Sequence, residues 1–494
     1  MSAGCPQDPL VFIDETRTVV SDAASQDSGA DDADVDFGSP CISEDSYPPD
    51  ALLSAGVVSV STPSVGHGGS PTDRFIQREM MTPRNDESPV SPTEIGPHAR
   101  VRAIPDPKLR FLMEQVYVNN PMWPLSDPTE AVLFRHFVQK LAIWLDLCDP
   151  EQNFQTKIPK QAGTCTVLMN AIFALASRHM SHVSNHDPLA SNRYIGECLK
   201  HLKPILHYPD TMRDENLFAA TIIQRVWEEM EVVIMGQDHQ GYMLSIHRFV
   251  ENGRLTPGSL SAAAFWIGLR QEIYIAVMSC EKVRVRLVPS LIDQSFSDAS
   301  DYMWANRAVV HCAEVLNFCF GDEYRSATRP ARWSELDAWN KQWSSNLPPY
   351  CAPIFNDKDS DSRFPEIWYH KSCHAIGAQH HILAALFLAR YDPNMGAYTD
   401  MKERIQSLVR RICGIGLGNQ WTPPSMFTAC MAIAAFAGEC FCDRRDQEAI
   451  LGILRKTEKD HARPTKAVQE EMMRKWNWVP EDAGMPMALD EQSG

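Results

Sequence analysis

The sequence lacks the short motifs that mark the large enzyme classes. It has no Gly-x-Ser-x-Gly turn for a nucleophilic serine and no phosphate-binding loop ending in Gly-Lys-Ser/Thr. Its one glycine-rich stretch, Gly414-Ile415-Gly416-Leu417-Gly418, follows a helical pattern and not a strand, so it is not a dinucleotide-binding fingerprint. We expect that stretch to end a helix. These absences predict that the chain is not an enzyme.

Segments that direct a chain into a membrane are also missing. The first residues show no basic stretch followed by an apolar one, which a secretory signal requires. The longest apolar run, from Phe427 to Cys442, is short and contains Glu439. Many of the fourteen cysteines, such as Cys198 and Cys312, lie in apolar helical patterns, where a reduced thiol packs as a small hydrophobe. We therefore expect a soluble protein in a reducing compartment, with no membrane partner.

A strongly basic segment is absent, and acidic residues are concentrated at the start. The net charge of the chain is -17, and residues 1–60 hold twelve acidic residues against one basic residue, Arg17. Those sixty residues supply eleven of the seventeen excess negative charges, and the rest of the chain carries only -6. Because no basic face is offered to a phosphate backbone, direct binding of this chain to nucleic acid is not expected.

The two ends of the chain differ in composition from its middle. Residues 1–103 are rich in Ser, Asp, Pro and Gly and never sustain a helical period, which predicts a disordered acidic region. Small apolar clusters such as Leu10 to Ile13 lie among the acids, as in activation segments, although we favour a solvated linker. Residues 479–494 are interpreted as a C-terminal tail.

Residues 104–478 show helical periodicity almost throughout. Asp127, Pro128 and Glu130 form a helix start signal, and an apolar stripe follows at Leu133, Phe137, Leu141 and Trp144. The same reasoning predicts helices near 166–181, 215–235, 262–280, 302–320, 366–390, 400–414, 424–441, 446–461 and 465–476. We see no fixed-period repeat, so the predicted fold class is all-α, an irregular multi-helix array.

Two segments depart from the helical pattern. Alternation from Val283 to Leu287 gives one doubtful indication of a strand. The stretch from Leu347 to Phe364 contains Pro348-Pro349 and a run of charges, which indicates a loop. The helical body could therefore be one unit or two packed halves joined by this loop.

A series of histidines is the first candidate for a metal site. His370, His374 and His381 share one helical face, with His380 and Cys373 nearby. Imidazoles can hold zinc, but a catalytic site needs further ligands, and no His-Glu-x-x-His pattern accompanies them. We favour histidines that only make hydrogen bonds and predict no metal site. A metal-dependent enzyme centred on these histidines is the weaker alternative.

A group of acidic residues is the second candidate. Its members lie at and beyond the end of the helix predicted at 215–235: Glu228, Glu229, Glu231, Asp238 and His239. A di-iron site needs two Glu-x-x-His pairs on facing helices, and only Glu458 and His461 have that spacing. We expect instead that Glu228 and Glu229 pair with Arg225 on a polar helix face.

Several segments together resemble the fungal-specific transcription factor domain of zinc-cluster regulators, in particular the branch typified by the cutinase-promoter activator. Each segment alone is ordinary helix, and the match rests on their number and order. The segments are residues 134–146 (FRHFVQKLAIWLD), 170–179 (NAIFALASRH), 214–220 (DENLFAA), 238–241 (DHQG), 264–274 (AFWIGLRQEIY), 304–306 (WAN), 364–368 (FPEIW) and 421–424 (WTPP).

The resemblance implies an all-helical regulatory domain over residues 104–478 that acts in the nucleus on RNA polymerase II transcription, often as a homodimer. In that family a separate N-terminal module binds DNA, and its six cysteines hold two zinc ions. Here only Cys5 and Cys41 precede Cys148, with no Cys-x-x-Cys, so that zinc cluster cannot form and no cofactor is predicted.

Two explanations for the missing module stay open. The sequence could come from a gene model without its first exon, or the regulator could reach DNA through a partner protein. We predict that the helical body controls the acidic region and contacts the transcription machinery, with a small-molecule effector in an apolar pocket or a dimer interface as the switch. The alternative is a helical interaction scaffold or co-regulator without direct DNA binding.

Overall fold

The computed structural model describes residues 101–184, 186–231, 240–288, 291–357, 362–394 and 398–478. Its contacts divide the chain into Met1–Pro92 and Thr93–Gly494, and all described residues belong to the second unit. The region predicted to be disordered, residues 1–103, lies outside the described residues except for its last three. The predicted tail, residues 479–494, lies outside them as well.

The described residues form an all-α fold, as predicted. The longer helices are α2 (Pro107–Val116), α3 (Pro128–His136), α7 (Thr166–Val183), α8 (Pro188–Ile205), α9 (Glu215–Glu231), α10 (Gln240–Asn252), α11 (Leu260–Ser279), α12 (Asp301–Phe320), α13 (Arg329–Asn346), α14 (Ser372–Arg390), α15 (Tyr398–Gly418), α16 (Pro424–Ala432), α18 (Arg444–His461) and α19 (Lys466–Lys475).

Short elements connect the longer helices. These are the π-helical turns η2 (Phe137–Leu141) and η7 (Ile433–Ala437), the 3₁₀ turns η3 (Pro209–Arg213), η5 (Asp322–Arg325) and η6 (Pro349–Cys351), and the short helices α4 (Ala142–Leu145), α5 (Asn153–Thr156), α6 (Ile158–Ala162) and α17 (Gly438–Cys440). Two strands, β1 (Phe355–Asp357) and β2 (Glu366–Trp368), pair antiparallel with Asn356 opposite Ile367.

Aspartate followed by proline begins several helices. Asp127 accepts a hydrogen bond from the Thr129 amide at 2.7 Å, and Pro128 occupies the first helical position. Asp106 and Asp187 cap α2 and α8 in the same way. An aspartate oxygen satisfies an amide that has no partner in the helix, and proline loses no hydrogen bond there. The local sequence therefore fixes where these helices start.

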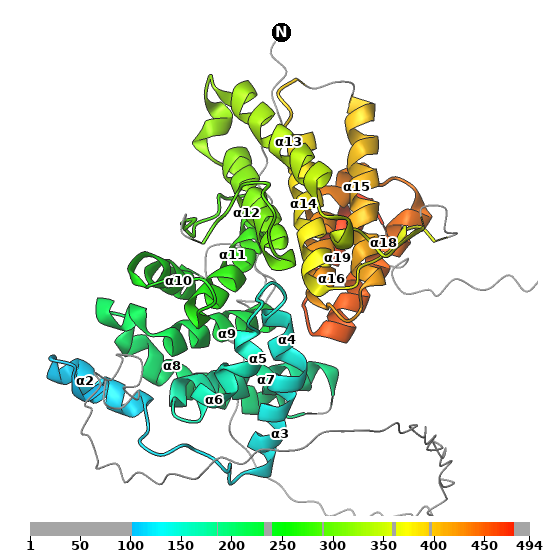
Figure 1. Cartoon of the computed structure of the whole chain (residues 1–494). Coiled ribbons are helices and arrows are strands. Elements are labelled where there is room, and N and C mark those ends of the chain that lie inside the picture. The colour runs from blue at the N-terminus through cyan, green and yellow to red at the C-terminus, as the bar shows by residue number, and fades with distance from the viewer. Residues whose placement is uncertain are drawn as a thin grey trace, which may run out of the picture. The chain divides into compact units, whose positions relative to one another are not determined.

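Helix α11 is the centre of the described body. It contacts α9 on one side and α12 on the other, and Figure 1 shows it between them. Nearly all of its side chains are buried, from Leu260 to Val277. A helix that is apolar on every side must be enclosed on every side, and the surrounding helices enclose α11.

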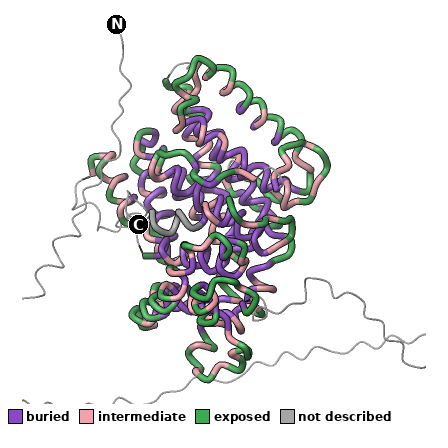
Figure 2. The backbone as a smooth tube through the Cα atoms, turned by 90° about the vertical axis from the view of Figure 1, so that its left-hand side faces the viewer, coloured by how far each residue is buried: buried purple, intermediate pink, exposed green. Residues whose placement is uncertain are grey.

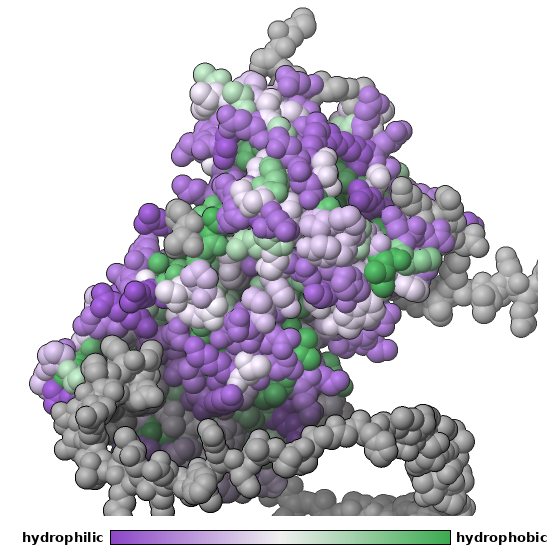
Figure 3. All heavy atoms as spheres, viewed as in Figure 1, coloured by the Kyte–Doolittle hydropathy of each residue, from purple (hydrophilic) through white to green (hydrophobic). Residues whose placement is uncertain are grey.

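The interior is apolar and the outer face is polar. Buried residues follow the inner turns of the helices and exposed residues follow the outer turns and loops (Figure 2). The face in Figure 3 is mostly hydrophilic, with hydrophobic residues in small separate areas. Among the described residues, no helix combines the length and apolarity that a membrane crossing requires.

Three local predictions were wrong. Residues 283–287 form no strand, and the strands lie instead at 355–357, inside the predicted loop, and at 366–368. The helix expected from residue 366 begins only at Ser372, because residues 366–368 pair with β1. The first predicted helix does start at Pro128, but a π-helical turn at 137–141 divides it before Leu145.

Candidate functional site

Helices α12 and α14 pack against each other closely and run in the same direction. Asp301 contacts His374 in the first turns of the two helices, and Ala305 contacts Gly377 about one turn later. A Cβ atom on Gly377 would lie only 2.9 Å from the Cα of Ala305, so the missing side chain permits this approach. The close contact sets the positions of the predicted histidines.

The predicted histidine series does not converge on one point. The His381 Nε2 donates to the carbonyl of Asn340 at 2.8 Å, and its ring stacks on Trp343 with the ring centres 4.6 Å apart. His370 and His374 lie together, with ring centres 4.6 Å apart. The neighbouring His380 donates through Nδ1 to the Ile376 carbonyl at 2.8 Å. The structure therefore brings His370 and His374 together and places His381 elsewhere.

A different set of ligand-type atoms meets at His374. One ligand atom each from Asp301, Cys351 and His374 lies within 4.8 Å of the other two. Asp301 is the first residue of α12, Cys351 ends η6, and His374 is in the first turn of α14. Sequence reasoning found only His374, because the other two residues are distant in the chain and belong to no motif.

The charges around this trio are balanced by a lysine. The Lys371 ammonium lies 2.5 Å from the Asp301 carboxylate. Burial opposes ionisation of Asp301, but the hydrogen bond and charge of Lys371 outweigh it, so the pKa of Asp301 is lowered. Burial lowers the pKa of His374 and raises the pKa of Cys351 to about 11. The trio thus consists of a carboxylate, a neutral thiol and a neutral imidazole at neutral pH.

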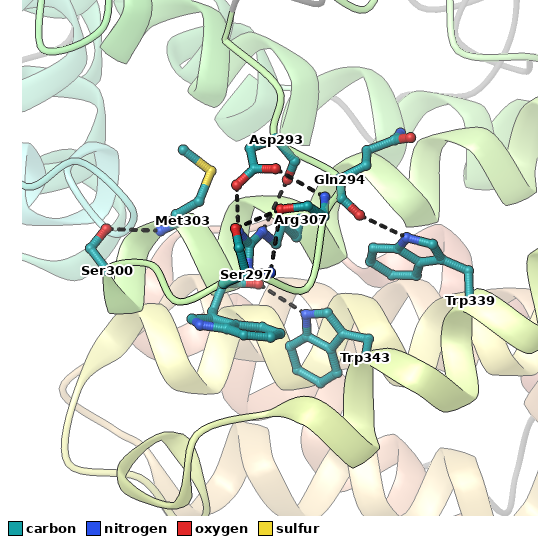
Figure 4. A network of polar contacts seen from close by, with 10 residues as sticks. Asp293, Gln294, Ser297, Ser300, Met303, Arg307, Trp339 and Trp343 are labelled. Carbon is teal, nitrogen blue, oxygen red and sulfur yellow. Dashed lines mark hydrogen bonds and ion pairs between the residues drawn. The ribbon is translucent and has the colours of Figure 1, made fainter.

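A buried arginine organises the loop before α12 (Figure 4). The Arg307 guanidinium donates to the carbonyls of Asp293 and Ser297, each at 3.0 Å, and pairs with the Asp293 carboxylate at 2.5 Å. Its side chain is 0% exposed and lies 4.6 Å from the centre of the Trp304 ring. Because a guanidinium has several donors in a fixed plane, one side chain holds this loop at both Asp293 and Ser297.

Two tryptophans of α13 close this region. The Trp339 indole donates to the Gln294 carbonyl at 3.3 Å, and the Trp343 indole donates to the Trp304 carbonyl at 3.1 Å (Figure 4). His311 stacks on Trp339 at 4.2 Å between ring centres, as His381 stacks on Trp343. We call this region the α12 junction and define it by Asp301, Arg307, His311, Trp339, Trp343, Cys351, His374 and His381.

The histidines of the α12 junction are neutral. Burial, helped by nearby His381 and Arg332, lowers the pKa of His311 to about 3. Burial lowers the pKa of His381 to about 4, although its hydrogen bond to Asn340 opposes the shift. His311 and His381 therefore act as flat, uncharged partners of the tryptophans and not as cations.

The predicted acidic group forms ion pairs in the interior. Glu228 pairs with Arg225 at 2.9 Å, and Glu229 lies 3.8 Å from the same guanidinium, so the predicted pairing is observed. The predicted location was wrong, because Arg225 is 0% exposed and the two glutamates are 6% and 7% exposed. Burial raises the pKa of Glu228 to about 7, against the opposing charge of Arg225.

An arginine from the end of the chain completes this group. Arg463, which follows α18, forms a buried ion pair with Glu229 and lies 4.4 Å from the centre of the Tyr274 ring. We call Arg225, Glu228, Glu229 and Arg463 the α9 charge cluster. It links α9 with α11 and with the turn between α18 and α19, so segments more than two hundred residues apart share one set of charges.

The other predicted acidic residues do not build a metal site with these. Glu231 pairs with Arg178, and Asp238 and His239 lie outside the described residues. Glu458 accepts hydrogen bonds from Thr465 and Gln469, while His461 packs edge-on against Trp144. The Glu458-x-x-His461 spacing therefore has a different role, in which the glutamate fixes the α18–α19 turn.

The glycine-rich stretch contributes to packing. Helix α15 ends at Gly418, as predicted, but Gly414 and Gly416 lie within the helix. A Cβ atom on Gly414 would lie 2.1 Å from the Pro365 carbonyl oxygen, and one on Gly418 would lie 2.5 Å from that of Ile367. These glycines let α15 lie directly against the segment of β2.

Comparison with known proteins gives one match. Residues 132–241 match the family model described as "Fungal specific transcription factor domain", which confirms the predicted resemblance over that segment. No curated protein and no solved structure matches the chain. The matched segment contains three members of the α9 charge cluster, whereas Arg463 and the whole α12 junction lie beyond it.

Proposed function

We propose that this chain is the helical regulatory part of a fungal transcription regulator that acts in the nucleus on RNA polymerase II transcription. The observation that carries the proposal is the match of residues 132–241 to the fungal specific transcription factor domain, within a body whose described residues are all-α. We do not propose an enzymatic activity, because that family is regulatory.

The proposal assigns DNA contact to another module or to a partner protein. Beyond residue 60 the chain has 45 basic and 51 acidic residues, so it offers no excess of cations to a phosphate backbone. The acidic residues 1–60 are better suited to contact basic surfaces of the transcription machinery. This chain would then reach a promoter only through the DNA-binding module or the partner protein to which it is attached.

The α9 charge cluster supports a regulatory role for the body as a unit. Glu229 lies in the matched segment and Arg463 lies 234 residues later, yet the two form one buried ion pair. A change at α9 that moves Glu229 must therefore also move the turn after α18 or leave a buried charge without its partner. A small-molecule effector or a second copy of the chain acting at either segment would reach the other by this route.

The test is a reporter experiment with the full chain fused to a heterologous DNA-binding module. A second fusion lacks residues 1–103, and a third carries residues 1–103 alone. We expect residues 1–103 alone to raise reporter output, the full chain to raise it less, and the truncated chain not to raise it. Equal, background output from all three fusions would contradict the proposal.

The alternative, a helical interaction scaffold without a transcriptional role, predicts a different distribution in the cell. A tagged full chain would then stay outside the nucleus and away from promoters. Nuclear accumulation together with a promoter-dependent reporter response would exclude that alternative.

A further inference from the structure

The trio at the α12 junction has the composition of a metal site. Asp301, Cys351 and His374 each place one ligand atom within 4.8 Å of the other two. The His374 Nε2 is already 3.3 Å from the Asp301 carboxylate, which is close to the separation of two ligands on one zinc ion. The thiol of Cys351 lies within 4.8 Å of both of these ligand atoms.

The His374 ring gives a second, independent indication. Its side chain is 1% exposed, and neither ring nitrogen makes a hydrogen bond. The contact of Nε2 with the Asp301 carboxylate, at 3.3 Å, does not have the geometry of a hydrogen bond. A buried polar group without a partner costs about 1–3 kcal/mol, and a metal ion bound to one ring nitrogen would remove part of that cost.

The donor set selects the type of metal. Cys351 releases its proton to solvent when the metal binds. The resulting thiolate and an imidazole disfavour Mg²⁺ and Ca²⁺, which prefer oxygen ligands. One sulfur, one nitrogen and one carboxylate oxygen suit Zn²⁺, which binds such ligands tetrahedrally. We propose that Asp301, Cys351 and His374 bind one Zn²⁺ ion and that a water molecule takes the fourth position. This site does not depend on the proposed transcriptional role.

Lys371 is the cation that zinc must replace. Its ammonium neutralises Asp301 at 2.5 Å in the metal-free chain, and its side chain is 47% exposed. The ammonium can therefore turn into solvent at little cost when the metal arrives. A substitution that removes the Lys371 charge would leave the three ligands in place, and the ammonium would no longer compete with zinc for the Asp301 carboxylate.

Zinc binding would connect three separate segments. Asp301 and His374 begin α12 and α14, and Cys351 follows the end of α13 through η6. The metal would hold the end of α13 against the first turns of both other helices. The same helices carry Trp339, Trp343 and Arg307, so the site and the loop in Figure 4 would become rigid together.

The experiment uses the full chain, stripped with a chelator and titrated with Co²⁺ as a spectroscopic substitute for Zn²⁺. We expect one equivalent of Co²⁺ to give a thiolate-to-cobalt charge-transfer band, and Zn²⁺ to abolish it. Cys351→Ser and His374→Gln should each weaken Zn²⁺ binding by more than about tenfold. Lys371→Met should strengthen it several-fold.

Matched controls separate this site from other thiols and histidines. Cys442→Ser removes an exposed thiol, and His381→Gln removes the member of the predicted histidine series that lies elsewhere. Both variants should keep the band and the affinity of the unaltered chain. Loss of the band in His381→Gln, or its persistence in folded Cys351→Ser, would overturn the proposal.

X-ray absorption of the zinc-loaded, unaltered chain gives a measurement that needs no variant to fold. We expect one sulfur at about 2.3 Å and nitrogen or oxygen ligands at about 2.0–2.1 Å. A first shell without sulfur, or the absence of tightly bound zinc in the folded chain, would also overturn it.

Discussion

The α9 charge cluster and the α12 junction bury polar side chains by opposite means. The α9 charge cluster keeps both signs of charge in the interior, where Glu228 and Glu229 face Arg225 and Arg463. The α12 junction buries one cation, Arg307, and keeps the imidazoles of His311 and His381 neutral against tryptophan rings. The comparison teaches that buried charge is tolerated where several helices fix its partner, and that a buried imidazole stays neutral where no opposite charge faces it.

The largest expected effect comes from breaking an ion pair of the α9 charge cluster. Replacing Arg463 with Met removes the direct ion pair of Glu229 and leaves it only the longer contact with Arg225 at 3.8 Å, so we expect a loss of about 3–5 kcal/mol in the free energy of unfolding. Urea unfolding followed by circular dichroism measures it. The double variant Arg463→Met with Glu229→Gln should recover part of the loss, because it removes both charges of this pair and leaves Arg225 paired with Glu228. A change below about 1 kcal/mol in the single variant would show that the pair contributes little.

The corresponding change at the α12 junction should cost less. Arg307→Ala removes the hydrogen bonds to Asp293 and Ser297, and we expect a loss of about 2–3 kcal/mol. The loss is smaller than for Arg463 because the side chain of Asp293 is 42% exposed and water can solvate it. The same urea unfolding compares the two variants. A loss larger than that of Arg463→Met would reverse the comparison.

The two regions should change the free energy of unfolding in opposite directions as the pH changes, and the α12 junction contributes to its loss as the pH falls. His381 has a pKa of about 4 in the folded chain against an ordinary value of 6.5, so the unfolded chain binds its proton first. The contribution of neutral His381 to the free energy of unfolding is complete above pH 6.5. It is lost as the pH falls toward 4, by at most about 3 kcal/mol. His381→Gln should flatten this limb of the stability curve. An unchanged curve would refute the assignment.

Glu228 of the α9 charge cluster contributes to the loss of stability as the pH rises. Its pKa is raised from 4.5 to about 7, so the folded chain holds a proton that the unfolded chain releases. This contribution is complete below pH 4.5 and is lost as the pH rises through 7, by about 1–3 kcal/mol. Glu228→Gln, compared with the unaltered chain between pH 5 and 8 by urea unfolding, should reduce that decline, and the part that remains is assigned to Asp146, whose pKa burial also raises to about 7. A steeper decline in the variant would contradict the account.

The last prediction concerns side-chain packing at glycines that lie outside both regions. Gly414→Ala would place a methyl group against the Pro365 carbonyl, so we expect a loss of about 1–3 kcal/mol. Gly452→Ala is the matched control, because nothing lies within 4 Å of its added Cβ. It should stabilise α18 by about 0.5–1 kcal/mol through better helix propensity. If Gly414→Ala and Gly452→Ala changed the thermal unfolding midpoint equally, the close contact between Gly414 and the Pro365 carbonyl would be contradicted.

The sequence predicted the fold class and most long helices, because apolar spacing and capping signals are local. Helix α8 was missed although Asp187 and Pro188 repeat the signal of Asp127 and Pro128. Helix α13 was missed because its few buried residues, such as Leu336 and Trp343, form a weak stripe. The β1–β2 pair could not be predicted, since each strand of three residues depends on the other.

The site was less accessible to sequence reasoning than the fold. The pairing of Glu228 with Arg225 followed from helical spacing, but its burial depends on Arg463, which is remote in the chain. His374 was identified as a ligand type, whereas Asp301 reaches it through the packing of α12 against α14, and Cys351 reaches it from η6. Contacts between distant helices carry no local signal.

The most direct test of the central claim is promoter occupancy of the full, tagged chain in its own cells. Chromatin immunoprecipitation would be combined with RNA measurement after depletion of the chain. The account predicts nuclear chain enriched at a defined set of promoters whose RNA polymerase II transcripts change on depletion. A chain absent from every promoter, with transcription unchanged by its loss, would contradict the account.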